Sequence, residues 1–306
     1  MYHYVRPEPE GLPYLRYMHL NDFCNQLEFF EKEYGFVGRE DFMRAVQTGQ
    51  PPESGVVLTF DDAICDHFYH VLPELLRRNI WGIFYIPTGV YTNGELLDVH
   101  QLHLLLGAFG GVKILDSLNH YITSDMLIQR HAEEFQDLPL DDDGDDELIA
   151  DRVKLILNKF IHHNFRAPLL KYLFRKHFNG VRITVKEFYL TVDQINYLQE
   201  SGMIIGSHAA SHRVLSRLDV SEQEREIKDS FDYLNEVTGG LNIRTFCYPY
   251  GDKDSFNAES ERLLEEAGCS FSFKVEPRSI TSDDLLNRRQ SLPRYDCNNF
   301  LFGNSR

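Results

Sequence analysis

Cysteine is scarce in this sequence, and its spacing matches neither a metal site nor a redox pair. The 306 residues contain five cysteines, and no two of them form a CxxC pair. Disulfide frameworks have a denser and even set, and thiolate zinc sites need closely spaced pairs. The sequence therefore predicts neither, and a reducing compartment fits it best. The five are Cys24, Cys65, Cys247, Cys269 and Cys297.

Positive charge is also in short supply. There are 31 Lys and Arg residues against 47 Asp and Glu residues, which gives a formal net charge of −16. Such a balance repels phosphate backbones and anionic lipid surfaces. We therefore expect no nucleic acid partner.

Long apolar runs are missing as well. No run approaches the ~18 apolar residues of a membrane span. The first residues, "MYHYVRPEPEGLPY", lack the basic segment and apolar core of a secretory leader. We expect a soluble cytoplasmic protein without a transmembrane segment, provided that Met1 is the native start. The sequence makes no prediction about the oligomeric state.

What the sequence does contain is an alternation of amphipathic helices and short apolar strands. Residues 21–47 predict helices, "GVVLTF" a buried strand, "CDHFYHVLPELLRRNI" a helix that kinks or starts late at Pro73, and "WGIFYIP" a second strand. After residue 190 the predicted helices are "TVDQINYLQESG", "SEQEREIKDSFDYLNEVTGG" (capped by Ser221 and Glu224) and "NAESERLLEEAGC". The strands there are "MIIGSH", "IRTFCYPYG" and "SFSFKV". This pattern predicts an α/β protein with a parallel sheet.

The segment from about residue 91 to 190 breaks this alternation. It contains three helical patterns, "DVHQLHLLLGAF", "DELIADRVKLILNKFIHHNF" and "APLLKYLFRKHF", around an acidic loop "LDDDGDDE", and "VRITV" is its first strand-like stretch. Loops at the carboxyl ends of barrel strands can grow and shape a binding site. We therefore interpret residues 1–306 as one domain with a helical insertion at about 91–190.

Polar residues follow two of the predicted strands. "TFDD" places Asp61 and Asp62 at one strand end, and "GSHAASH" places His208 and His212 at another. Parallel α/β sheets gather such ends on one face, and one carboxylate with two imidazoles suits zinc, cobalt, nickel or iron. A cation there would bind one aspartate and offset the repulsion between the two. The other aspartate would then stay ionised and could act as a general base.

Each pattern alone also has an ordinary structural interpretation. An Asp-Asp pair after a strand is typical of a helix N-terminus, and a His-x-x-x-His pair is often solvated or structural. Their combination at strand ends of one α/β chain favours the site. Apart from His3, the other histidines fall mostly in helical patterns, and we predict them to be surface or packing residues, including the pairs His67/His70 and His100/His103.

A third strand, in "RTFCYPYGD", ends in Tyr248, Pro249, Tyr250 and Gly251. A plain exit from a strand through Pro and Gly is common. The same residues could also form an aromatic wall of a binding groove, with backbone N–H groups that bind a developing oxyanion.

These three segments, in this order, resemble the first three motifs of the polysaccharide deacetylases, carbohydrate esterase family four, which have the NodB-homology fold. The resemblance covers about residues 50–90 and 190–275. It implies a distorted (β/α) barrel of seven or eight strands and a metal-dependent hydrolysis of N-acetyl groups on amino sugars. By position, Asp61 matches the general base, Asp62, His208 and His212 match the metal ligands, and the Tyr250 backbone N–H matches an oxyanion donor. The implied metal is zinc, with cobalt or nickel as alternatives.

Two departures from the family pattern point to a subgroup. Tyr248 stands before Pro249 where many members have arginine, and no histidine follows His212 to act as the usual late acid. A subgroup similar to the poly-N-acetylglucosamine deacetylases has "YPYG" in the third motif and takes its acid from an N-terminal "YH" segment. This chain begins "MYHYV", so the resemblance implies His3 as the general acid. It also implies residues 2–5 as the first barrel strand, and Arg294 in "LPRYD" as a partner of Asp61.

The resemblance implies that the substrate is an N-acetylated amino sugar in a polysaccharide or oligosaccharide. Because the sequence shows no signal peptide, we favour a nucleotide-, lipid- or oligosaccharide-linked precursor of a surface polysaccharide. Tyr248, Pro249 and Arg294 are then the predicted substrate-binding residues. Two other functions stay open: a deformylase or small-molecule amidase that uses the same metal site, and a catalytically silent sugar-binding protein.

Overall fold

The protein is described by a computed structural model that covers residues 1–136, 145–179 and 183–304. The chain forms two compact units. Unit 1 comprises Met1–Pro7, Tyr17–Glu95 and Thr184–Arg306, and unit 2 comprises Glu8–Arg16 and Leu96–Ile183. The single domain with a helical insertion at about 91–190 stays a prediction.

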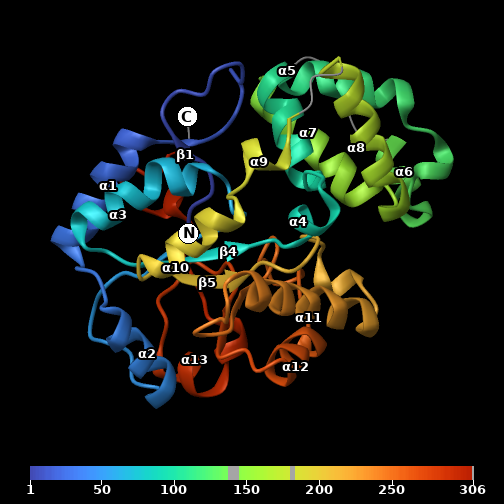
Figure 1. Ribbon diagram of the computed structural model, residues 1–306. Coiled ribbons are helices and arrows are strands. Elements are labelled where there is room, and N and C mark those ends of the chain that lie inside the picture. The colour runs from blue at the N-terminus through green and yellow to red at the C-terminus, as the bar shows by residue number, and fades with distance from the viewer. Residues whose placement is uncertain (137–144, 180–182, 305–306) are drawn as a thin grey trace. The chain divides into compact units, whose positions relative to one another are not determined.

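Unit 1 is built on a parallel sheet of five strands whose order follows the chain (Figure 1). Neighbouring strands are joined by helices, as the alternation in the sequence predicts. All five strands are buried, which suits the nearly continuous apolar character of parallel strands. The α/β class is therefore confirmed. The strands are β3 (Leu58–Phe60), β4 (Gly82–Ile86), β5 (Ile204–Ser207), β6 (Thr245–Cys247) and β7 (Phe271–Phe273).

Single bridges extend this sheet at both edges and turn it into a distorted barrel. Tyr2 pairs in parallel with Phe60 on β3, and Leu292 pairs in parallel with Phe273 on β7. The two added segments also meet each other, because the Met1 nitrogen donates to the Tyr295 carbonyl over 2.8 Å. The predicted barrel is confirmed, and its ring closes through the first residues of the chain.

The predicted first strand, residues 2–5, divides into two parts. Only Tyr2 joins the barrel, while β1 (Val5–Arg6) pairs with β2 (Met18–His19) in a separate two-stranded sheet. The Tyr2 hydroxyl donates to Gln26 over 2.5 Å and its ring stacks on Phe60. These contacts fix the N-terminal segment beside β3.

The helices of unit 1 lie around the outside of the sheet (Figure 1). Most follow the predicted patterns, but the cap predicted at Ser221 and Glu224 is wrong: Asp219 and Glu222 form the capping box, two residues earlier. Pro73 lies in the first turn of its helix, which is the predicted late start, after a π-helical turn at His67–Val71. The helices are α1 (Leu20–Glu33), α2 (Arg39–Thr48), α3 (Leu72–Arg78), α4 (Gly89–Asn93), α9 (Val185–Phe188), α10 (Val192–Glu200), α11 (Val220–Val237), α12 (Ala258–Glu266) and α13 (Ser282–Asn287).

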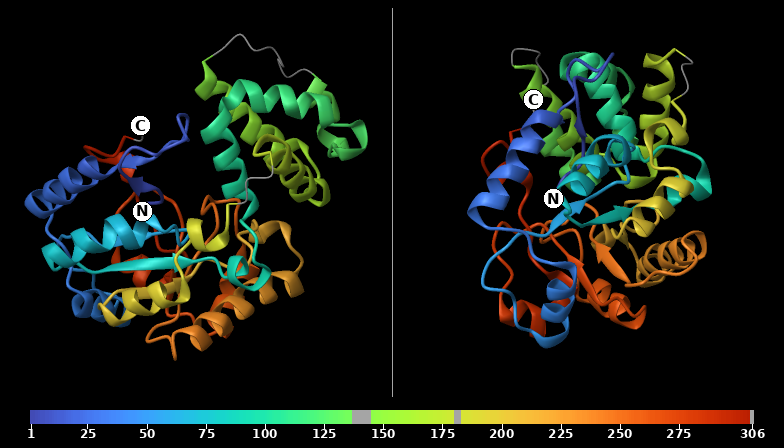
Figure 2. Two further views of the ribbon diagram at one scale, coloured as in Figure 1. Left: turned by 45° about the horizontal axis from the view of Figure 1, so that its top comes forward. Right: turned by 60° about the vertical axis from the view of Figure 1, so that its left-hand side comes forward.

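Unit 2 is helical, and its helices group together in both views of Figure 2. The longest is broken at Gly110, which has φ 77° and ψ 166°. The Asp146 carboxylate accepts from the backbone of Gly111 and Val112 and so caps the part of the helix after the break. Leucine and isoleucine side chains form a separate core for this unit. The helices are α5 (Asp98–Tyr121), α6 (Ala132–Gln136), α7 (Asp146–Leu155) and α8 (His163–His177).

Two details of the predicted insertion differ from the structure. The helix predicted from "DELIADRVKLILNKFIHHNF" ends near Ile161, after a π-helical turn at Ile156–Phe160, and α8 begins only at His163. In "VRITV", residues 181–182 lie outside the described residues, and Val185 starts a helix rather than ending a strand. Most of the predicted acidic loop, through residue 144, lies outside the described residues too. None of the described helices is both long and apolar enough to cross a bilayer.

Close packing at the centre of the sheet leads to a first prediction. A Cβ atom on Gly206 would lie 2.5 Å from the Tyr85 ring and 2.9 Å from the Thr245 methyl group. Gly206→Ala should therefore lower the free energy of unfolding by about 1–3 kcal/mol through overpacking, as measured by urea titration. An unchanged free energy would mean that the Tyr85 ring can move aside.

Candidate active site

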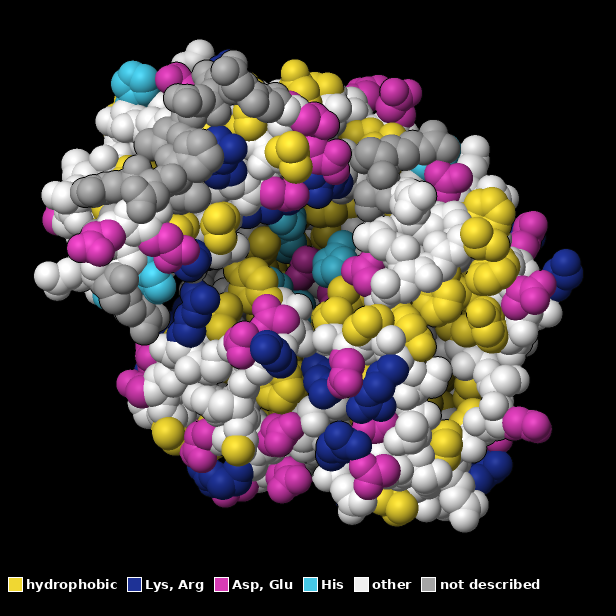
Figure 3. Space-filling view, turned by 180° about the vertical axis from the view of Figure 1, so that it is seen from behind, with side chains coloured by type: hydrophobic (Ala, Val, Ile, Leu, Met, Phe, Trp, Pro, Cys, Tyr) yellow, Lys and Arg dark blue, Asp and Glu magenta, His cyan; other side chains and the backbone are white. Residues whose placement is uncertain are grey.

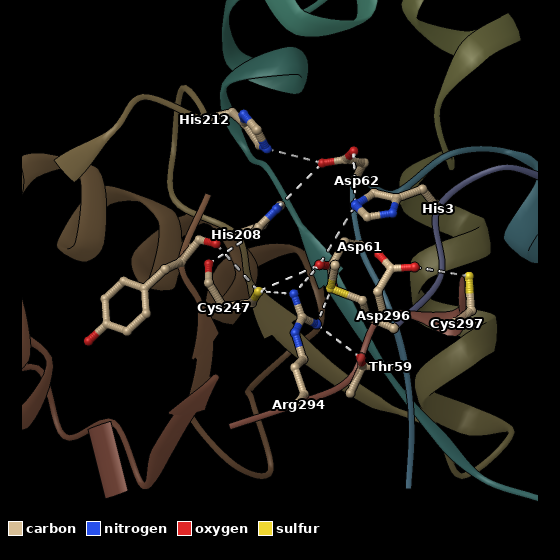
Figure 4. Close-up of polar contacts among 12 residues, drawn as sticks. His3, Thr59, Asp61, Asp62, His208, His212, Cys247, Arg294, Asp296 and Cys297 are labelled. Atoms are coloured by element: carbon tan, nitrogen blue, oxygen red, sulfur yellow. Dashed lines mark hydrogen bonds and ion pairs between the residues drawn. The ribbon is translucent and has the colours of Figure 1, made fainter. Parts of the chain in front are cut away.

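The carboxyl ends of β3 and β5 bring the predicted polar residues together. Asp61 and Asp62 follow β3 directly, and His208 and His212 follow β5, which is separated from β3 only by β4. Figure 4 shows the His208 and His212 rings pointing toward Asp62, while Asp61 faces Arg294. The two aspartates are therefore directed toward different partners.

Asp62, His208 and His212 form a set that could hold a metal ion. The Asp62 Oδ1 atom lies 3.5 Å from His208 Nε2 and 3.3 Å from His212 Nε2. One potential ligand atom from each residue lies within 4.8 Å of the others, and all three residues are buried. Two imidazoles and one carboxylate are a normal donor set for zinc and for other divalent transition metals.

The tautomer of His208 fits a metal ligand. Its Nδ1 atom lies 2.7 Å from the Cys247 carbonyl, which can only accept, so Nδ1 carries the proton. The lone pair is then on Nε2, the atom that faces Asp62. Burial, despite the neighbouring carboxylates, lowers the pKa of His208 to about 4, so the ring is neutral at physiological pH. A second hydrogen bond that orients a ligating histidine in this way is typical of metal centres.

The backbone around these residues is strained. Eight described non-glycine residues have positive φ; four of them lie in the three predicted motifs and a fifth directly follows the first motif. Such conformations cost of order 1–3 kcal/mol each and persist only where the surroundings enforce them. They often occur at functional sites. The five are Asp62 (φ 76°), Ala63 (φ 54°), Ala209 (φ 61°), His212 (φ 57°) and Tyr250 (φ 65°).

Asp61 is held by Arg294, as the resemblance implies. The Arg294 guanidinium donates to both carboxylate oxygens of Asp61, and also to the Thr59 hydroxyl over 2.9 Å. Burial alone would raise the pKa of Asp61, but the guanidinium outweighs it and holds that pKa well below its usual range. Asp61 is therefore ionised at any physiological pH, and its two oxygens have a fixed orientation.

A second cluster of potential ligands overlaps the first. Asp61, His208 and Cys247 also offer atoms within 4.8 Å of one another. However, Arg294 Nη2 lies 2.7 Å from the Cys247 sulfur and also contacts Asp61. The positively charged guanidinium of Arg294 therefore already occupies the space between these two residues. Burial also raises the pKa of Cys247 far above its usual value and keeps it a thiol. The set that includes Asp62 is therefore the better candidate for a metal ion.

His3, near the N-terminus of the chain, lies beside Asp61 and Asp62. Its Nε2 atom lies 4.0 Å from a carboxylate oxygen of Asp61 and 4.0 Å from one of Asp62, and its side chain is 38% exposed. An exposed ring beside two buried carboxylates could exchange protons with solvent and with a substrate.

Two residues that sequence reasoning did not select hold the segment around His3. The His67 Nε2 atom donates to the His3 carbonyl over 2.8 Å. Both carboxylate oxygens of Asp66 accept from the Arg6 guanidinium, over 2.7 and 2.8 Å. The predicted packing role of His67 is correct as far as its ring contacts Phe60, but it misses this hydrogen bond. No sequence signal could have found it, because the partner is a backbone carbonyl 64 positions away.

The third motif has one exposed and one buried tyrosine. Tyr250 is 36% exposed, and its ring centroid lies 5.1 Å from that of His212. Tyr248 is 1% exposed, and its hydroxyl donates to the Gln290 carbonyl over 2.7 Å. The Tyr248 side chain thus belongs to the core, and Pro249 is buried beside it. Substrate binding by Tyr248, Pro249 and Arg294 stays a prediction.

The buried ion pair leads to a second prediction. Arg294→Met would leave the Asp61 charge buried without its partner and should lower the free energy of unfolding by about 3–5 kcal/mol. Adding Asp61→Asn removes both charges, so the double variant should recover part of that loss in urea titrations.

The pH dependence of this effect has a definite sign. The depressed pKa of Asp61 stabilises the wild type above the unfolded-state value of about 3.9, and this contribution fades as the pH falls further. In Arg294→Met burial raises the pKa of Asp61, so the gap in unfolding free energy between wild type and variant should begin to narrow above about pH 4 and narrow further below it. A gap independent of pH would mean that the pair does not stabilise the fold through its charges.

Both charge signs also occur close together on the molecular surface. On the face in Figure 3, Lys and Arg side chains lie among Asp and Glu side chains. The expected lack of a nucleic acid partner stays a prediction.

Comparison with known families identifies the fold and the motifs. Residues 48–272, more than half of the chain, match the polysaccharide deacetylase family. A comparison with curated proteins gives no significant match.

Several solved structures have a similar fold. They include deacetylase PplD of Streptococcus pyogenes in complex with acetate (TM-score 0.58, 16% identity, 96% of this chain and 89% of that chain). IcaB from Ammonifex degensii has a TM-score of 0.50 at 16% identity, over 89% of this chain and 81% of that chain. The BpsB deacetylase domain from Bordetella bronchiseptica has a TM-score of 0.52 at 12% identity, over 96% and 94%. At these identities the similarity concerns the fold alone. Together with the family match over the three motifs, it confirms the family resemblance: the chain belongs to the polysaccharide deacetylase family, whose members are carbohydrate deacetylases.

Proposed function

We propose that this protein is a metal-dependent hydrolase that removes the N-acetyl group from an amino sugar. The observation that carries the proposal is that Asp62, His208 and His212 lie close enough together to bind one metal ion, with the ionised Asp61 beside them. Family membership supports deacetylation of a carbohydrate. The metal, the roles of the residues and the linkage of the sugar are the parts that we add.

The proposed metal is zinc, held by Asp62, His208 and His212. The mixed carboxylate and imidazole set and the neutral state of His208 support this choice, with cobalt or nickel as substitutes. When bound, the ion supplies Lewis acidity that activates water and stabilises negative charge on the acetyl oxygen.

Asp61 is the proposed general base. It takes a proton from the attacking water, whose oxygen adds to the acetyl carbon and gives a tetrahedral oxyanion. Arg294 contributes by holding Asp61 ionised and in one orientation, since it contacts both oxygens. The Tyr250 backbone N–H is a proposed donor to the oxyanion.

His3 is the proposed general acid. It donates a proton to the sugar nitrogen as the C–N bond breaks, and acetate and a free amine leave. Two observations support this role: His3 lies 4.0 Å from both aspartates, and its segment is held by the His67 hydrogen bond. The proposed substrate is an amino sugar in a polysaccharide, an oligosaccharide or a lipid- or nucleotide-linked precursor of a surface polysaccharide.

The adjacent aspartates offer a matched pair of variants. Asp61→Asn should lower kcat by about 10²–10⁴-fold but leave zinc bound, because Asp61 is not a proposed ligand. Asp62→Asn should lose both activity and zinc, as measured by elemental analysis after dialysis and by deacetylation of N-acetylglucosamine oligomers. An active Asp61→Asn enzyme would show that the base is wrongly assigned. A wild type that retains no metal and releases no acetate would favour a silent sugar-binding protein.

The role of His3 can be tested through the leaving group. His3→Gln should lower kcat on an N-acetyl sugar by about 10²–10⁴-fold, since an amine must be protonated to leave. The same variant should retain most activity on an aryl acetate such as 4-nitrophenyl acetate, whose leaving group needs no proton. Equal losses on both substrates would contradict the acid role and indicate a structural one.

A further inference from the structure

The loop that carries His208 and His212 is bound to one buried carboxylate on α11. Glu226 Oε2 accepts from the Ser211 backbone nitrogen over 2.7 Å, and Glu226 Oε1 accepts from the Ser211 hydroxyl. The Arg213 guanidinium donates to the same Oε1 atom over 3.1 and 3.2 Å. The Glu226 carbonyl also accepts from Ala210 over 3.1 Å. Glu226 thus binds three of the four residues from 210 to 213, namely Ala210, Ser211 and Arg213.

Glu226 stands where the helix pattern calls for an apolar residue. It is only 4% exposed and lies on the face of α11 that includes Ile227, Ser230 and Leu234. A carboxylate in such a position is unfavourable unless hydrogen bonds and an opposite charge compensate it. Ser211 and Arg213 supply both, so the interaction is specific to this loop.

The loop is held from its other side as well. The Gly89 nitrogen donates to the Ala210 carbonyl over 2.6 Å, and a Cβ atom on Gly89 would lie 2.6 Å from that oxygen. On either side of these attached residues, Ala210 and Ser211, the backbone at Ala209 and His212 has positive φ. Strained conformations of this kind relax when a restraint is removed.

We propose that Glu226 is a positioning residue that sets the metal affinity of this site, by holding the loop so that His212 faces Asp62 and His208. The inference rests on the proposed metal site and extends it to a residue of α11. The Glu226 carboxylate binds Ser211 and Arg213, which are neither proposed metal ligands nor the proposed general base. Its removal should therefore weaken metal binding more than it lowers kcat at saturating metal.

Glu222 provides a matched control on the same helix. Its carboxylate accepts from Arg213 Nη1 over 3.1 Å, but its side chain is 32% exposed, against 5% for Glu226. Both residues pair with Arg213, and only Glu226 contacts Ser211. Glu→Gln at each position removes one charge with little change in volume.

The experiment measures the zinc Kd of full-length apo-protein by competition with a chromogenic chelator. Glu226→Gln should weaken zinc binding by about 10–100-fold, the usual effect of losing an outer partner of a metal site. Glu222→Gln should change it by less than about fivefold, as expected for a surface ion pair. At saturating zinc, kcat of Glu226→Gln should return toward the wild-type value, and Glu226→Asp should retain part of the affinity.

The outcomes separate this inference from the proposed function. If wild type binds zinc and Glu226→Gln binds it equally well, while its thermal unfolding temperature falls, Glu226 supports only the fold and the inference is overturned. If kcat stays low at saturating zinc, the residue acts on the reaction rather than on metal affinity, which also overturns it. A wild type that binds no divalent metal would overturn the proposed function, and the inference with it.

Discussion

The buried ion pair between Arg294 and Asp61 is the interaction on which the rest of the site depends. It joins the last segment of the barrel to the end of β3, because Arg294 follows Leu292 and also contacts Thr59. It also determines which aspartate is available to a cation. With both oxygens of Asp61 engaged by a guanidinium, the neighbouring Asp62 is left to face the two histidines. A single cationic side chain therefore leaves two adjacent carboxylates facing different partners.

Closure of the barrel has a second consequence for the chemistry. The ring closes through Met1 and Tyr2, so the residue that follows them, His3, is carried to the edge where the strand ends meet. The hydrogen bond from His67 and the ion pair between Arg6 and Asp66 hold this segment. His67 and Asp66 belong to the turn that follows Asp61 and Asp62. One stretch of chain thus supplies both carboxylates and the support for the proposed acid.

The ligand loop shows how a strained backbone can be maintained. Ala209 and His212 adopt left-handed conformations on either side of Ala210 and Ser211, which are attached to Gly89 and Glu226. Neither attachment has the form of a motif. Gly89 is required because a Cβ atom would meet the Ala210 carbonyl, and Glu226 is a polar residue on the buried face of a helix. The second of these could be noticed in sequence as a break in the apolar pattern of α11, although the pattern alone does not say what the carboxylate binds.

The sequence by itself predicted the local features: strands, helices and short motifs. Apolar runs and helix periodicity determined the α/β class, and the order of "TFDD", "SHAASH" and "YPYGD" identified the family, because residues within a motif are close along the chain. Helix boundaries shifted where capping residues compete, as at Asp219 and Ser221. Contacts between distant positions were decided only by the tertiary structure: His3 beside Asp61, Arg294 on both of its oxygens, His67 on the His3 carbonyl, and Glu226 under Ser211. The first three pairs are brought close by the closure of the barrel and the fourth by the packing of α11 against β5. No periodicity or spacing encodes such pairs.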